Sequence, residues 1–282
     1  TKEALGTTAP GTMFEDKVTK DNHIYLVKKA MNESTEKDLV EKKLLMDLIG
    51  EGMYEGAYLN EAAAMSAAKK VVTQGIVYAN ERNQFGRAIA KYGAIKHKIG
   101  EQAIRVFALE TALYRCGQAI DDWTDKLVAE GVDHEKAKLK GVEQFAIEAA
   151  ILKVYGSETL DFVVDEGVQI YAGMGFSADA PMDRSYRDSR INRIFEGTNE
   201  INRMLTVDMI LKRALKGELD LMGPAMQVVN ELMSIPSMDD LPEGIFAAEE
   251  KMLEGFKKTI LMVAGSAVQK LMQTLSKEQE VL

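Results

Sequence analysis

Residues 145–155 read Phe-Ala-Ile-Glu-Ala-Ala-Ile-Leu-Lys-Val-Tyr, and their pattern indicates the fold class of the chain. Its apolar side chains at positions 145, 149, 152 and 155 recur every three or four residues, which is the period of an α-helix. The same period appears upstream, at Ile104, Phe107, Ala108 and Ala112. The pattern therefore predicts long helices in the middle of the chain.

Proline is scarce, and this favours uninterrupted helices. The chain has five prolines, and none of them lies between residues 11 and 180. Because a proline ring breaks the interior of a helix, its absence permits helices of many turns, and we expect an all-α fold. The expected helices cover residues 57–81, 89–130, 135–174 and 188–216, followed by an apolar-periodic segment at 245–275.

Two short segments are expected to interrupt these helices. Glu130-Gly131-Val132-Asp133 supplies a glycine that can end one helix and an aspartate that can cap the next, which predicts a helical hairpin. The glycine-containing segment from Gly173 to Pro181 predicts a long loop. Because functional residues are often found on loops, this segment is a candidate location for a functional site.

The chain is expected to have three regions. Residues 1–56 form a weakly patterned amino-terminal segment without assignment, and residues 57–217 form the main helical bundle. After Gly217 the pattern changes, because three prolines mark turns before the last apolar-periodic segment. We therefore expect residues 218–282 to be an appended helical extension.

Composition excludes several classes of protein. The 282 residues carry a net charge of −9, which argues against nucleic-acid binding and against binding to anionic membranes. No stretch approaches the roughly 18 uninterrupted apolar residues of a membrane-spanning helix. Cys116 is the single cysteine, so an internal disulfide and a cysteine-rich zinc site are excluded, and its apolar helical surroundings predict a buried structural thiol.

Charged residues gather between positions 184 and 200. Four arginines precede Glu196 in this segment, at positions 184, 187, 190 and 193. Their density suits an anionic ligand, but pairing with Asp183, Asp188 and Glu200 is an equally good interpretation. Phe195 and Gly197 flank Glu196, so the carboxylate can lie beside an apolar wall with open backbone approach, a setting that can raise its proton affinity toward that of a general base. An ordinary surface position is the alternative interpretation for a lone glutamate.

Other common sites are poorly supported. Gly173-x-Gly175 follows a helical pattern rather than a strand, so a dinucleotide-binding βαβ unit is a weak interpretation. The sequence contains no Glu-x-x-His motif for a di-iron bundle, and we expect no metal site. Surface positions are expected for the three histidines, His23, His97 and His134.

Three ordered motifs resemble those of one enzyme family. Arg82-Asn83-Gln84-Phe85-Gly86 resembles the Arg-x-Gln-Phe-Gly signature of acyl-CoA dehydrogenases. Residues 187–201, Arg-Asp-Ser-Arg-Ile-Asn-Arg-Ile-Phe-Glu-Gly-Thr-Asn-Glu-Ile, resemble the family's carboxy-terminal signature. Between them, Val168-Gln-Ile-Tyr-Ala-Gly-Met-Gly-Phe176 is similar to its flavin loop. The resemblance covers residues 62–217, and the tail resembles the extension of the very-long-chain type.

The resemblance implies the helical bundle of the acyl-CoA dehydrogenase carboxy-terminal domain and its FAD-dependent α,β-dehydrogenation of acyl-CoA thioesters in fatty-acid β-oxidation. Glu196 matches the base that removes the α-proton, and Gly197 matches a residue beside the substrate thioester. Positions that contact FAD in the family are matched by Arg82, Gln84, Phe85, Gln169, Gly173, Thr198 and Glu200.

The resemblance also implies partners. It implies a homo-oligomer, because the first motif usually reaches the flavin across a subunit interface, and an electron-transfer flavoprotein as electron acceptor. We expect long-chain substrates and a cytoplasmic location, with the mitochondrial matrix as the alternative location. The amino-terminal helical domain and middle β-domain of a complete member are not recognisable in the chain. The alternative hypothesis is a noncatalytic helical interaction module derived from this family.

Overall fold

The computed structural model describes residues 61–233 and 244–271. The prediction for residues 1–56 and the position of His23 therefore lie outside the described residues. Within the described ranges the structure is helical apart from one small hairpin, which confirms the predicted all-α class. In the same ranges no helix is both long and apolar enough to cross a membrane.

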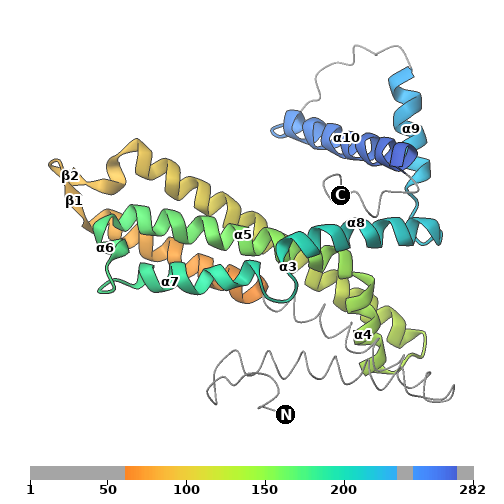
Figure 1. Cartoon of the computed structure of the whole chain (residues 1–282), viewed down its shortest axis with the longest axis horizontal. Coiled ribbons are helices and arrows are strands. Elements are labelled where there is room, and N and C mark those ends of the chain that lie inside the picture. The colour runs from red at the N-terminus through yellow and green to blue at the C-terminus, as the bar shows by residue number, and fades with distance from the viewer. Residues whose placement is uncertain (1–60, 234–243, 272–282) are drawn as a thin grey trace.

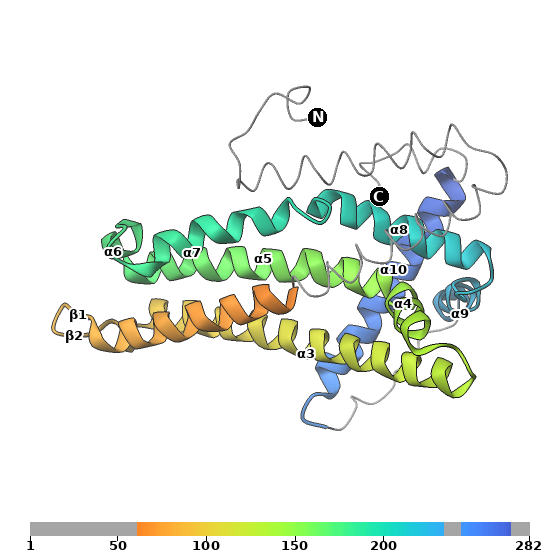
Figure 2. The ribbon, with the colours of Figure 1, turned by 90° about the horizontal axis from the view of Figure 1, so that it is seen from below.

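The central element of the bundle is α5 (Ala146–Tyr171). It contacts α3 (Gly93–Ala129) on one side and α7 (Pro181–Ser189) and α8 (Asn199–Leu215) on another. Figure 2 shows α5 between the layer of α7 and α8 and the layer formed by α3 and the helix of residues 61–81. Because α5 has neighbours on several sides, apolar side chains are buried around much of its circumference.

The hydrophobic core lies where the helix of residues 61–81 meets α3, α5 and α7. One cluster consists of Ala64, Ala68, Val71, Val106, Leu160, Val163, Val164 and Met182. A second, adjoining cluster consists of Met65, Leu109, Leu113, Cys116 and Leu152. Small side chains on the helix of residues 61–81 allow it to approach α5 closely.

The predicted helical hairpin is confirmed. Helix α3 ends at Ala129 and α4 (His134–Gln144) begins five residues later. Gly131 has a φ of +90°, a conformation that favours glycine, and the Asp133 carboxylate accepts a hydrogen bond from the backbone N–H of Lys136 at 3.3 Å.

The helix expected at 89–130 begins later than predicted, at Gly93. It is preceded by an antiparallel hairpin of β1 (Asn83–Gln84) and β2 (Arg87–Ala88) and by the short 3-10 helix η2 (Ile89–Lys91). The hairpin turns at Phe85 and Gly86, whose φ angles are +52° and +84°. Positive φ at both central residues matches the right-handed twist of the flanking strands.

The single helix expected at 135–174 is wrong, because Phe145 separates α4 from α5. The break has a tertiary cause. The guanidinium of Arg213, in α8, donates to the backbone oxygens of Glu143 and Gln144, at 2.7 Å each. These carbonyls lie at the end of α4, where the helix has no internal donors for them.

Two further boundaries differ from the prediction. The loop expected from Gly173 contains the four-residue helix α6 (Gly173–Phe176), and α7 begins at Pro181. The helix expected at 188–216 is also wrong, because that region contains the end of α7, the 3-10 helix η3 (Arg190–Arg193), an irregular turn and then α8. Glu196 lies in this turn rather than on a helix.

The extension contains two helices in its described part. They are α9 (Met222–Met233) and α10 (Ala247–Leu271), which contact each other. The last helix falls within the predicted range of 245–275, whose final residues lie outside the described part. Figure 1 shows this pair set apart from the bundle, beyond α8.

Candidate functional site

The irregular turn between η3 and α8 presents Glu196. Both Glu196 and Gly197 have positive φ angles, of +53° and +81°. For a residue other than glycine, such a conformation costs about 1–3 kcal/mol and persists only where surrounding contacts impose it. The glycine cannot easily be replaced, because a Cβ at position 197 would lie 3.0 Å from the side-chain nitrogen of Asn202.

Side chains of α8 hold this turn from one side. The amide nitrogen of Asn202 donates to the backbone oxygens of Glu196, Gly197 and Thr198, at 3.4, 2.9 and 3.1 Å. Thr198 caps the helix, since its hydroxyl accepts from the backbone N–H of Ile201 at 3.3 Å. Asn202 is buried, so its contacts are shielded from water and fix the entry to α8.

Glu200 occupies the first turn of α8 and is exposed. Hydrogen bonds to its own backbone N–H and to the hydroxyl of Thr198, together with the positive charges of Arg203 and Lys153, lower the pKa of its carboxyl group. Glu200 is therefore an anion at neutral pH, placed beside the exposed edge of the turn.

A buried lysine holds the turn from the other side. Lys153, in α5, donates from Nζ to the backbone oxygen of Gly197 at 2.7 Å and to Oδ1 of Asn199 at 2.8 Å. Asn199 in turn donates to Oγ of Ser157 at 3.0 Å, and Ser157 donates to the backbone oxygen of Lys153 at 2.7 Å. These contacts connect α5, the turn and the first residue of α8.

A second buried charged group, the carboxylate of Glu61, acts electrostatically on Lys153. Gly156 makes room for it, because a Cβ at that position would lie 1.7 Å from Glu61 Oε2. The sequence interpretation did not include Lys153, Glu61 or Asn202. The only signal was a lysine inside an otherwise apolar stretch of α5.

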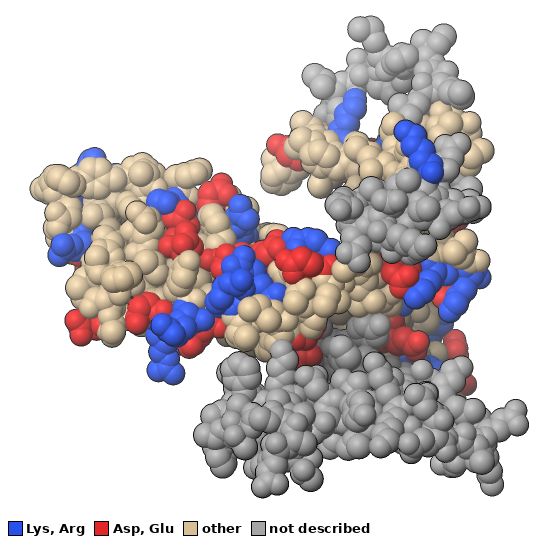
Figure 3. All heavy atoms as spheres, viewed as in Figure 1, with Lys and Arg blue, Asp and Glu red and all other residues tan. Residues whose placement is uncertain are grey.

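The four arginines do not form one cluster. Arg184 pairs with Asp188 at 3.6 Å, and both side chains are exposed. Arg193 pairs with Asp161 of α5 at 3.0 Å, a partner that the sequence interpretation did not consider. Arg187 and Arg190 are exposed and form no ion pair with the described part of the chain. Figure 3 likewise shows acidic and basic side chains interspersed over one face of the molecule.

The remaining candidate residues lie at the other end of α5. Figures 1 and 2 both place the β1–β2 hairpin and α6 together at one end of the bundle. The rings of Tyr78 and Tyr171 stack there with their centroids 4.0 Å apart, and the hydroxyl of Tyr171 donates to the backbone oxygen of Gln74 at 3.3 Å. This stack joins the end of the helix of residues 61–81 to the end of α5.

The hairpin presents its candidate residues to solvent. Arg82 and Gln84 are exposed, and Phe85 at the tip is 92% exposed. Tyr92 supports the backbone of the hairpin, because its hydroxyl can donate to the backbone oxygens of Gln84 and Phe85, at 3.0 and 3.3 Å. The hairpin therefore displays a cation, an amide and an aromatic ring on a supported backbone.

Gln169 and Gly173 lie beside the same end of the bundle and are both exposed. The chain turns between them at Ala172, whose φ is +52°. A Cβ added at Gly173 would meet no atom within 4 Å, so the backbone there is open to a ligand. A different constraint applies to Gly175, where a Cβ would lie 2.4 Å from the backbone oxygen of Val168.

The structure therefore divides the candidate residues into two groups. Glu196, Gly197, Thr198 and Glu200 meet at the turn before α8, whereas the hairpin and the α5–α6 turn carry the others. The two groups are separated along α5 by the distance from Ser157 to Gln169, which is about 18 Å at 1.5 Å per residue. One chain alone does not bring the two groups into contact.

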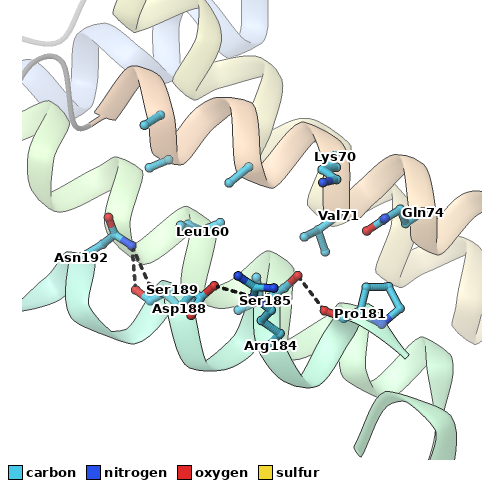
Figure 4. A pocket seen from close by; sticks show the side chains of 14 residues that line it. Lys70, Val71, Gln74, Leu160, Pro181, Arg184, Ser185, Asp188, Ser189 and Asn192 are labelled. Carbon is cyan, nitrogen blue, oxygen red and sulfur yellow. Dashed lines mark hydrogen bonds and ion pairs between the residues drawn. The ribbon is translucent and has the colours of Figure 1, made fainter. Parts of the chain in front are cut away.

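A groove of about 620 Å³ separates the helix of residues 61–81 from α7. Figure 4 shows Lys70 and Gln74 on one wall and Arg184 and Asp188 on the other. Glu196 is not among its lining residues, so the groove is separate from the turn. No group of three or more possible metal ligands occurs in the part of the chain that the structure covers.

Two expectations about single residues are confirmed. Cys116 is buried, and burial is the main reason that the pKa of its thiol rises to about 11. The thiol is therefore protonated near neutral pH and unsuited to be a nucleophile. His97 and His134 are exposed, as expected.

Known proteins match most of the chain. Residues 46–211 match the family described as "Acyl-CoA dehydrogenase, C-terminal domain", and residues 255–282 match a second family of the same description. A "Probable acyl-CoA dehydrogenase" of Bacillus subtilis is 40% identical over 251 residues, which are 86% of this chain and 42% of that protein. A mitochondrial "Very long-chain specific acyl-CoA dehydrogenase" of Rattus norvegicus is 32% identical over 178 residues, covering 63% of this chain and 23% of that protein.

One solved structure is similar over most of the chain. It is an acyl-CoA dehydrogenase complexed with FAD from Bacillus anthracis, with a TM-score of 0.78 and 40% sequence identity. The match covers 82% of this chain and 39% of that one. This chain thus spans about two fifths of the length of its Bacillus relatives.

Proposed function

The chain belongs to the acyl-CoA dehydrogenase family, through the carboxy-terminal domain, and we therefore propose that it takes part in FAD-dependent α,β-dehydrogenation of acyl-CoA thioesters. Glu196 serves as the base that removes the α-proton, and Gly197 lies beside the thioester. The observation that carries the proposal is the strained turn at Glu196 and Gly197, held from both sides by Lys153 and Asn202.

A base must be fixed in position before it can remove a proton from carbon. Proton transfer requires the carboxylate within hydrogen-bonding reach of the proton, and small displacements reduce the rate strongly. The Glu196 backbone is constrained, while its side chain is only partly buried and so remains accessible to a substrate. Backbone strain of this kind clusters at functional sites, which supports the assignment.

The exposed residues at the hairpin end fit FAD. The guanidinium of Arg82 is exposed and forms no ion pair with the described residues, so it is available to a pyrophosphate. The ring of Phe85 can stack on adenine, and the open backbone at Gly173 allows close approach of a phosphate or sugar. Gln84 and Gln169 supply exposed amides for the adenosine portion. When bound, FAD accepts the β-hydrogen of the substrate as a hydride.

The two groups of residues support a homo-oligomer. Thr198 and Glu200 lie beside the base, whereas the hairpin lies about 18 Å further along α5. The hairpin projects beyond the bundle with an apolar ring at its tip. In such an oligomer the hairpin residues of one protomer would help to hold a flavin that serves Glu196 of another protomer.

Membership of the family also supports a proposal for the pathway, the substrate and the electron acceptor. We assign the reaction to fatty-acid β-oxidation, with long-chain acyl-CoA as substrate and an electron-transfer flavoprotein as acceptor. The chain-length assignment rests on the similarity to the Rattus norvegicus protein, whose name specifies very-long-chain substrates. Because the chain spans about two fifths of its Bacillus relatives, a noncatalytic helical interaction module is the alternative that the experiment must distinguish.

The test is flavin retention and reduction. The purified chain is incubated with FAD, desalted and examined by visible absorption with and without palmitoyl-CoA. The same measurement is made on a completed protein, in which this chain is fused to the part of the Bacillus subtilis relative that it does not cover. We expect the completed protein to retain flavin that bleaches with substrate. No retained flavin in either form would refute the enzymatic proposal in favour of the noncatalytic module.

Two variants test the base. Glu196→Gln is expected to retain flavin and to lose bleaching, because an amide cannot accept the α-proton. Glu254→Gln makes the same change on the exposed surface of α10 and is expected to behave as wild type. Bleaching at the wild-type rate in Glu196→Gln would remove Glu196 from the mechanism.

A further inference from the structure

Lys153 is the largest fully buried side chain in the described part of the molecule. Lysine is almost never fully buried unless its ammonium group is paired, because removal of a charge from water is costly. Here Nζ donates to the carbonyl of Gly197 and to the side chain of Asn199, which lie on either side of Thr198. A buried cation thus contacts the turn that carries Glu196 without being adjacent to it in sequence.

Four carboxylates act electrostatically on this cation. Glu61 approaches from the helix of residues 61–81, Glu158 from α5 itself, and Glu200 from α8, while Glu196 lies in the turn. Burial lowers the pKa of Lys153, and all four carboxylates act in the opposite direction, with Glu61 first among them. Burial outweighs these carboxylates, so the pKa of Lys153 lies below its usual range, and the two hydrogen bonds from Nζ fix the lysine at the turn.

We infer that Lys153 is a positioning residue for the proposed base, holding the Glu196–Gly197 turn in its left-handed conformation through the Gly197 carbonyl. This inference rests on the function proposed above. The left-handed φ of Glu196 needs compensation from contacts, and the shortest of the hydrogen bonds to the turn is the one from Lys153. Charged donors also give stronger hydrogen bonds than neutral amides.

A purely structural role is the competing explanation. Lys153 also offsets the buried charge of Glu61, so its removal can destabilise the fold without any effect on the turn. A double variant distinguishes positioning of the turn from compensation of the Glu61 charge. Lys153→Met alone leaves Glu61 buried without this cation, whereas Lys153→Met with Glu61→Gln removes both charges together. The matched control is Lys140→Met, on the exposed surface of α4.

The first readout needs no substrate. Amide hydrogen exchange is measured on the segment 195–202 of the chain, alongside urea unfolding. We expect the double variant to recover stability relative to Lys153→Met, yet to exchange faster than wild type at this segment. Lys140→Met should match wild type in both measurements. A double variant with wild-type protection of the turn would overturn the inference, since Lys153 would then serve only to balance Glu61.

The second readout is the rate of flavin reduction by palmitoyl-CoA in the completed protein. The double variant is expected to reduce flavin on the order of a hundredfold more slowly, because a misplacement of about 1 Å can cost that much. Half-saturation and flavin content should stay within about twofold of wild type, since Lys153 contacts neither ligand in this proposal. A wild-type rate would refute positioning. If wild type itself fails to reduce flavin, the proposed function fails, while the exchange measurement still judges the contact between Lys153 and the turn.

Discussion

Gly156→Ala tests the packing around the buried carboxylate of Glu61. Gly156 lies in α5, directly against the carboxylate of Glu61. An alanine Cβ would lie 1.7 Å from Glu61 Oε2, 2.8 Å from Glu61 Cδ and 3.3 Å from Leu109 Cδ1. Both Glu61 and Leu109 are fully buried, so neither can move into solvent without disturbing the core.

The expected magnitude follows from opposing contributions. In an open helix, alanine would be more stable than glycine by about 0.5–1 kcal/mol. Overpacking costs about 1–3 kcal/mol, and a contact of 1.7 Å places this substitution at the upper end of that range. We therefore expect a net loss of about 2 kcal/mol in the free energy of unfolding.

Urea unfolding followed by far-ultraviolet circular dichroism measures this change. Gly100→Ala is the matched control, because it makes the same substitution in α3, where a Cβ would meet no atom within 4 Å. It should raise stability slightly, by up to about 1 kcal/mol. Combining Gly156→Ala with Glu61→Asp, which shortens the obstructing side chain, should recover part of the loss. The reasoning is wrong if Gly156→Ala is as stable as Gly100→Ala.

Three further predictions concern separate parts of the chain. Arg82→Ala should lower the flavin content of the completed protein after desalting, whereas Arg115→Ala on the exposed face of α3 should not; equal content would remove Arg82 from the flavin site. Asp133→Ala should cost about 1 kcal/mol in urea unfolding, because α4 loses its capping carboxylate; an unchanged midpoint would contradict this. Burial raises the pKa of Cys116 from 9.0 to about 11, so the stability that this favours below pH 9 is lost as pH rises toward 11. The free energy of unfolding should therefore fall more steeply over that range in wild type than in Cys116→Ala, and parallel curves would rule this out.

Local signals in the sequence predicted the fold class and the α3–α4 hairpin. Gly131 and Asp133 act on the backbone next to them, so their effect can be inferred without knowledge of the tertiary structure. The burial of Cys116 followed from the apolar period of its helix for the same reason. Such features depend on neighbours in sequence, which is why the prediction of them succeeded.

The helix breaks that the sequence did not predict depend on distant residues. Phe145 interrupts an apolar-periodic run that contains no proline there, and the carbonyls before it are satisfied by Arg213, about seventy residues away. Likewise, helical periodicity continues through residue 196, but Lys153 and Asn202 hold the turn in another conformation. Periodicity alone could not indicate either contact.

The candidate site was predicted only in part. Motif resemblance named Glu196 and the proposed flavin contacts, and these roles remain predictions. The structure adds their division into two groups, which sequence order could not reveal because α5 separates residues 157 and 169 in space. Lys153 escaped notice because a lysine is usually a surface residue, and only tertiary packing makes it buried.

The buried network around Lys153 is poorly explained by stability alone. Buried ion pairs can often be replaced by apolar side chains of similar volume with little loss, and sometimes with a gain. Apolar side chains, however, would not give the Gly197 carbonyl a donor, nor would they fix the orientation of Asn199 at the start of α8. Because hydrogen bonds are directional and hydrophobic contacts are not, the network specifies one conformation of the turn where an apolar core would tolerate several. A chain selected only for stability would not need a lysine at this position, whereas one that must hold a carboxylate on a strained turn would.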